Sequence, residues 1–184
     1  QTIIKNAILQ FQNQHAGSSL NISNDEIVIR ISSNQMPNLT IIDLPGMISL
    51  HQSDKGQSES IVDDIKELIK HYIIQKNTII LAIMPARVDL ETDHSLAFIK
   101  QYDSNFERTV GILTKVDLMN EKSDICDYLT NNISKSLQLG YGYFGIKFTP
   151  DIDLNQNKII ETEYFNQHNS YSQLEDKSRL GINN

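Results

Sequence analysis

The sequence predicts an α/β fold of three layers, in which a mixed, mostly parallel sheet carries helices on both faces. Three observations lead to this prediction. Apolar runs of strand length alternate with segments of helical periodicity along the 184 residues, as they do in successive β–α–β units. Several runs are apolar throughout, which is typical of strands covered on both faces. Two runs end in short polar motifs, at the edge where open α/β sheets bind ligands.

Five segments are expected to form strands. The first, Glu26–Ile31, alternates with a period of two, as a half-buried strand does. Continuous apolar runs follow at Leu39–Ile42, Thr78–Met84 and Thr109–Leu113. A later strand is expected over Tyr143–Phe148.

Helical periodicity fills the intervals between the later strands. Ser58–Gln75 carries its apolar residues on one stripe, and its first residues provide the capping and acidic side chains of a helix start. The same pattern predicts helices over Thr92–Tyr102, Lys122–Leu139 and Asn157–His168. These helices would cover the sheet.

The segment after Ser170 is a polar tail, in which only Leu174, Leu180 and Ile182 are expected to act as anchors. Neither an internal repeat nor a linker divides the sequence. We therefore expect residues 1–184 to belong to one domain, which the polar tail closes from about residue 170.

Composition narrows the classes of function. The net charge is −7, so the general basic footprint of a nucleic-acid-binding protein is not expected. One cysteine, Cys126, excludes a disulfide framework and favours a reducing, cytoplasmic compartment. Its place in a helical pattern predicts a core position rather than a nucleophile. The five histidines show no metal-ligand spacing, and no apolar run approaches the roughly 20 residues of a membrane span.

The first polar motif is D-x-x-G, formed by Asp43, Leu44, Pro45 and Gly46. Asp43 follows an apolar run directly, and a carboxylate there can hold Mg²⁺ through water, because Mg²⁺ keeps several of its waters. Gly46 has no Cβ, so its backbone N–H can approach a phosphate oxygen. The motif is short enough to occur by chance, and a strand-ending turn is the other interpretation.

The second polar motif is T-K-x-D, formed by Thr114, Lys115, Val116 and Asp117. A carboxylate at Asp117 can accept hydrogen bonds from the ring N–H and the exocyclic amine of guanine, a donor pair that adenine lacks. Lys115 can lay its aliphatic stem along the base, and Thr114 can tie the loop together. A turn at a helix start remains the alternative. The two motifs, in this order and each after its own strand, together predict a guanine nucleotide site.

A third motif, a glycine-rich one, matches by its letters only, and we reject it as a binding site. The segment from Gly140 to Gly145 fits G-x-G-x-x-G, but the dinucleotide fingerprint requires a strand before it and a helix after it. Here a helix is expected before and a strand after, so a dehydrogenase-type site ranks far below the other functions. The phosphate-cradling G-x-x-x-x-G-K-[ST] loop does not occur in these residues.

The strings NLTIIDLPGM, NTIILAIMPARVDLETDHSLAFIKQYD and RTVGILTKVDLM resemble the GTPase domain of dynamin-like large GTPases, the group of dynamins and antiviral Mx proteins. The P-A-x-x-D-L segment at Pro85–Leu90 distinguishes this group from small GTPases. Weaker similarity continues through GYGYFGI and EYFNQHNSYSQLEDKSRLGI, so the resemblance covers nearly all residues from about Ile22.

The resemblance implies binding of GTP and GDP and Mg²⁺-dependent hydrolysis. In full-length members it also implies self-assembly and often membrane remodelling. By position, Asp43 and Gly46 fall on the metal and γ-phosphate loop, with Asp43 facing the metal. Thr114, Lys115 and Asp117 fall on the guanine loop. No catalytic residue is assigned, because the P-loop and the switch threonine of the family would lie before Gln1.

The sequence departs from the family pattern at Phe148-Thr149-Pro150-Asp151, where the family has a polar loop that closes over the base. An alternative to the enzyme is therefore a nucleotide-free relic of the GTPase fold that serves as an assembly module. We expect a complete domain with a P-loop to be a GTPase. The isolated 184 residues are expected to lack GTPase activity and to bind GTP in the millimolar range at best.

Overall fold

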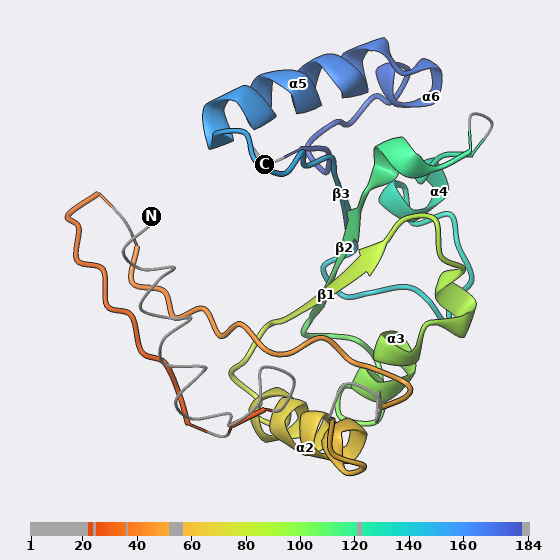
Figure 1. The fold of residues 1–184 in the computed structure, drawn as a ribbon. Helices are drawn as coiled ribbons and strands as arrows, with labels where there is room; N and C mark the ends of the chain where they lie inside the picture. The colour runs from red at the N-terminus through yellow and green to blue at the C-terminus, as the bar shows by residue number, and fades with distance from the viewer. Residues whose placement is uncertain (1–21, 24, 36, 52–56, 121–122, 182–184) are drawn as a thin grey trace. The chain divides into compact units, whose positions relative to one another are not determined.

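The computed structural model of this chain describes residues 22–23, 25–35, 37–51, 57–120 and 123–181. These residues fall into two compact units, Gln1–Ile74 and Gln75–Asn184. Helix α2 belongs to the first unit, and the sheet belongs to the second (Figure 1). Assignment of residues 1–184 to a single domain stays a prediction.

The sheet of the second unit contains three parallel strands, β1 (Ile80–Pro85), β2 (Thr109–Thr114) and β3 (Tyr143–Ile146), in the order β1-β2-β3 (Figure 1). β2 is the central strand. Its last residue, Thr114, lies opposite Pro85 of β1 and opposite Ile146 of β3. The three carboxyl ends therefore meet at one edge of the sheet. The predicted α/β fold with a mostly parallel sheet is confirmed, and the strands predicted at these three places are present.

The helices lie largely where periodicity predicts them. Their bounds are Ile61–Ile73 for α2, His94–Ile99 for α3, Cys126–Leu129 for α4, Leu154–Gln167 for α5 and Asn169–Ser172 for α6, with 3-10 helices at Leu90–Thr92 and Val116–Leu118. The prediction of one helix over Lys122–Leu139 is wrong beyond α4. The polar segment after α4 contains Asn131, whose φ of 61° is left-handed and ends the helical path.

The strands predicted over Glu26–Ile31 and Leu39–Ile42 do not form. Both segments belong to the first unit, and their apolar side chains are exposed, including Ile31 at 80% and Ile41 at 77%. In the part of the chain that the structure describes, no neighbouring strand pairs with either segment. An apolar run becomes a strand only when a partner backbone accepts and donates its hydrogen bonds.

The tail closes against β3. Gly145 donates to the backbone carbonyl of Arg179 and accepts from the N–H of Gly181, each at 2.9 Å, which makes a short bridge beside the strand. Leu180 is 6% exposed and serves as the predicted anchor. Tyr171, which was not predicted as an anchor, is fully buried in α6. Ile182 lies outside the described residues.

A buried carboxylate sets the start of the central strand. Asp103 is 7% exposed and accepts from the backbone N–H of Glu107 at 3.1 Å and of Arg108 at 3.0 Å. It also accepts from the hydroxyl of Thr109, the first residue of β2, at 2.7 Å. Because β2 leads directly into the T-K-x-D loop, this turn helps to position the candidate site.

Replacement of Asp103 should destabilise the fold. Asp103→Ala leaves three donors without their acceptor, so we expect the free energy of unfolding to fall by about 2–4 kcal/mol. Urea denaturation of the native protein would measure the change. Asp63→Ala is a suitable control, since the Asp63 side chain is 84% exposed and lies 3.8 Å from Lys66, and it should change stability by less than about 0.5 kcal/mol. Equal effects of the two variants would contradict this role for Asp103.

Candidate functional site

The T-K-x-D loop occupies the carboxyl end of the central strand, as predicted. Thr114 ends β2, and its hydroxyl donates to the carbonyl of Met84 in β1 at 3.3 Å. Lys115 takes a left-handed conformation with φ of 58°, which turns the chain from the strand into the 3-10 helix that contains Asp117. Lys115 is exposed, while Val116 is 1% exposed and packs inward. The loop thus presents Lys115 and Asp117 on an anchored backbone.

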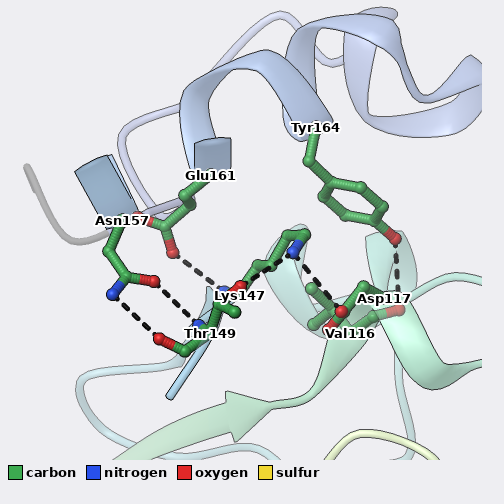
Figure 2. A network of polar contacts seen from close by, with 7 residues as sticks. All are labelled: Val116, Asp117, Lys147, Thr149, Asn157, Glu161 and Tyr164. Atoms are coloured by element: carbon green, nitrogen blue, oxygen red, sulfur yellow. Dashed lines mark hydrogen bonds and ion pairs between the residues drawn. The ribbon is translucent and has the colours of Figure 1, made fainter. Parts of the chain in front are cut away.

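The carboxylate of Asp117 forms an ion pair with Lys147. The Lys147 Nζ atom lies 3.4 Å from Asp117 Oδ2, and the two side chains are 14% and 28% exposed, respectively. Lys147 directly follows β3. The ion pair therefore joins the polar groups at the ends of two neighbouring parallel strands (Figure 2).

Helix α5 holds the segment that carries Lys147. The Lys147 backbone N–H donates to Glu161 Oε1 at 2.8 Å, and the Thr149 backbone N–H donates to Asn157 Oδ1 at 2.7 Å. The Asn157 amide donates in return to the Thr149 carbonyl at 3.0 Å (Figure 2). Both helix side chains are only 1% exposed. Two buried side chains of α5 therefore fix the main chain at residues 147 and 149. We call Asn157 and Glu161 together the α5 clamp.

Tyr164 connects the same helix to the T-K-x-D loop. Its hydroxyl donates to the Val116 carbonyl at 3.2 Å, and its ring centroid lies 5.8 Å from Lys147 Nζ. Burial, and after it the negative charge of Asp117, raises the pKa of Tyr164 above its ordinary value. The hydroxyl accordingly stays a neutral donor at physiological pH. Helix α5 thus contacts both loops of the site (Figure 2).

The D-x-x-G residues Asp43, Leu44, Pro45 and Gly46 belong to the first unit, whereas Thr114–Asp117 belong to the second. Asp43 and Gly46 are exposed, and a Cβ built on Gly46 would meet no atom within 4 Å. Among the described residues, no three or more carboxylate, imidazole or thiol groups converge on one point.

Sequence reasoning did not identify the residues that surround Asp117. Lys147, Asn157, Glu161 and Tyr164 lie 30 to 47 residues further along the chain, and only Lys147 left a signal that could have been used. It is a charged residue at the end of a strand parallel to β2, and carboxyl ends of parallel strands share one edge. The predicted strand over Tyr143–Phe148 placed Lys147 inside the strand, whereas β3 ends at Ile146.

The structure also bears on three further sequence predictions, which concern the glycine-rich segment, Cys126 and membrane-spanning helices. The last three residues of Gly140–Gly145 lie within strand β3, so a strand stands where the dinucleotide fingerprint requires a helix. The helix expected before this segment is absent as well. Cys126 lies in α4 with intermediate exposure, so the predicted core position is met only in part. Burial, reinforced by Asp124, raises the pKa of its thiol to about 12, which disfavours the thiolate. Across the described ranges, no helix is both long and apolar enough to cross a bilayer.

Comparison with known proteins gives consistent matches. A sequence model of the dynamin family matches residues 2–116. Dynamin-B of Dictyostelium discoideum is 36% identical over 93% of the chain, and phragmoplastin DRP1A of Arabidopsis thaliana is 35% identical over 95%. The interferon-induced GTP-binding protein Mx2 of Oncorhynchus mykiss is 34% identical over 97%. The chain spans 19%, 29% and 29% of these three relatives.

Removal of the Asn157 side chain from the α5 clamp should lower the local stability of the segment after β3, which carries Lys147. Asn157→Ala removes the partners of the part-buried N–H and carbonyl of Thr149, so we expect a loss of about 1–3 kcal/mol in stability and faster hydrogen exchange at the Thr149 amide. Asn155→Ala is the matched control, because Asn155 is exposed on the first turn of the same helix. Unchanged exchange at Thr149 in Asn157→Ala would contradict the clamp.

Proposed function

The chain belongs to the dynamin family, and from that premise we propose that it supplies the guanine loop and the metal-facing loop of a domain that binds and hydrolyses GTP with Mg²⁺. The observation that carries the proposal is the position of Asp117. Its carboxylate stands on an ordered loop at the carboxyl end of the central strand, the edge at which open α/β sheets bind ligands. One side of it is still accessible, with the side chain 28% exposed.

Base selection follows from the donor pattern of the purine. Guanine presents a ring N–H and an amine next to each other, and one carboxylate accepts both hydrogen bonds. Adenine presents no such pair at the same edge. Lys115 is exposed beside this carboxylate and can cover a face of the base with its aliphatic stem. Thr114 contributes through its bond to Met84, which fixes the start of the loop.

Asp43 is proposed as the residue that faces Mg²⁺ and the γ-phosphate, with Leu44, Pro45 and Gly46 forming the loop around it. Mg²⁺, when bound, would neutralise charge on the phosphate oxygens during hydrolysis. An exposed carboxylate can reach the ion through water, and the open space around Gly46 allows a phosphate oxygen to approach its N–H. No catalytic residue is assigned within these residues.

The partners of the whole protein are part of the proposal, since the chain covers less than a third of its relatives. We propose guanine nucleotide as the ligand and self-assembly through regions partly outside this chain. We further propose a cytoplasmic location with membrane association of the full-length protein. These points rest on family membership and, for the compartment, on the use of a single cysteine.

A nucleotide-free assembly module is the second candidate, and one observation favours it. Asp117 is engaged by Lys147, and the adjoining segment has Phe148 and Pro150 in place of a polar loop that closes over the base. If this arrangement closed the site, the fold would persist without nucleotide. Measurement of nucleotide affinity separates the two candidates.

Asp117→Ala should abolish the preference for GTP over ATP in the native full-length protein. Loss of a charge-assisted, two-point contact costs on the order of 2–4 kcal/mol, which is roughly a hundredfold in affinity. Calorimetric titration with GTP and with ATP would measure it. Asp176→Ala, at an exposed aspartate in the tail, is the control and should keep the preference. Equal affinities of the unmodified protein for GTP and ATP would refute the proposal and favour the assembly module.

Asp43→Ala should separate hydrolysis from nucleotide binding. We expect GTP turnover to fall by about 10–100-fold, because the carboxylate orients the metal and the γ-phosphate. GDP affinity should change little, since Asp43 faces neither the base nor the diphosphate. Steady-state phosphate release and GDP titration would test this, with Asp63→Ala as an exposed control in the same unit. Unchanged turnover would mean that Asp43 is only a turn residue.

A further inference from the structure

Lys147 is held in place more firmly than a surface lysine. Its backbone N–H is bonded to Glu161, its Nζ atom lies 3.4 Å from Asp117 Oδ2, and the ring of Tyr164 lies 5.8 Å from the same atom (Figure 2). The side chain is 14% exposed. The ammonium group also donates to the hydroxyl of Thr149 at 3.5 Å, so Asp117, Thr149 and the Tyr164 ring together define where it stands.

The position of the ammonium group matters because of the order of hydrogen-bond donors and acceptors along the edge of guanine. The edge of the base that faces Asp117 carries two donors, the N1–H and the N2 amine, followed by an acceptor, O6. If Asp117 accepts from both donors, O6 lies next to the carboxylate and requires a donor. Lys147 provides three N–H donors beside Asp117 Oδ2.

Two main-chain donors of the neighbouring loop are already used. The N–H of Lys147 is bonded to Glu161, and the N–H of Thr149 is bonded to Asn157, both through side chains that are 1% exposed. If either N–H donated to a base instead, a buried oxygen of the α5 clamp would lose its hydrogen-bond donor. The Lys147 side chain can turn toward a ligand without breaking these bonds.

On the basis of the proposed function, we propose that Lys147 is a specificity-determining residue whose ammonium group donates a hydrogen bond to guanine O6, while Asp117 accepts from N1–H and N2. The 3.4 Å separation is longer than the 2.7–2.9 Å of a tight charge-assisted bond, so each group can face the base while the opposite charges stay adjacent. Adenine carries an amine where guanine carries O6. That amine would meet the cation donor to donor, and Lys147 therefore strengthens the rejection of adenine.

Lys147→Met in the native full-length protein tests the proposal, because methionine keeps the length of the aliphatic stem and removes the donor. We expect GTP affinity to fall about tenfold or more and ATP affinity to stay level or rise, since the donor-to-donor contact with the adenine amine is removed. The melting temperature should change little. Lys135→Met removes the same charge at an exposed position and should leave GTP affinity near that of the unmodified protein. An unchanged GTP affinity in Lys147→Met would overturn the proposal.

A double substitution separates contact with O6 from positioning of Asp117. Asp117→Asn removes the ion pair and should favour xanthosine triphosphate, which has an acceptor at C2 and keeps O6. Adding Lys147→Met to Asp117→Asn should weaken xanthosine triphosphate by a similar factor to that seen with GTP. No added effect would overturn the proposal, because it would mean that Lys147 acts only through Asp117.

A modified base provides a second measurement if Asp117→Asn binds no xanthosine triphosphate. Replacement of O6 by sulfur, in 6-thioguanosine triphosphate, should cost affinity in the unmodified protein and cost much less in Lys147→Met. Equal losses in both proteins would overturn the role of Lys147. Failure of the proposed function itself gives a different result, since the unmodified protein would then show no preference for GTP over ATP.

Discussion

The candidate site depends on two buried polar side chains of helix α5. Asn157 and Glu161 bind the main chain of the segment after β3, and their burial makes each bond costly to lose. Fixing this backbone places the Lys147 stem, and thereby its ammonium group, against Asp117. Because Tyr164 of the same helix also binds the Val116 carbonyl, one element aligns the ends of β2 and β3. The α5 clamp holds the segment after β3 and Tyr164 holds the loop after β2, so the polar groups of both strand ends lie together.

Features encoded by neighbouring residues could be predicted from the sequence. The runs at β1, β2 and β3 are apolar and short, so their strand character is local, and the motif Thr114–Asp117 follows from the polar residues that end β2. Lys147 and Tyr164 could not be assigned in this way, because they contact the T-K-x-D loop across 30 to 48 residues. A contact of that kind depends on strand order and register, which no short pattern specifies.

The elements that were predicted wrongly failed for two different physical reasons. The runs at Glu26–Ile31 and Leu39–Ile42 have the composition of strands, but a strand is defined by hydrogen bonds to a neighbour, and composition does not supply the neighbour. Periodicity over Lys122–Leu139 likewise favours a helix, yet Asn131 and the polar residues beside it favour turns. The strand failures depend on tertiary context, whereas the helix failure depends on turn-forming residues within the predicted range.

The strength of the Asp117–Lys147 ion pair decides whether it could close the site. At 3.4 Å, with side chains 28% and 14% exposed, the pair is partly solvated, and such pairs contribute up to about 1 kcal/mol. A two-point contact between a carboxylate and guanine is worth about 2–4 kcal/mol. If Asp117 binds guanine as proposed, the base competes for the carboxylate without displacing Lys147, because an ammonium group beside it also suits O6. In the absence of ligand the ion pair is weak, and in the proposed complex its carboxylate would face the donors of guanine while its ammonium group faced the acceptor O6.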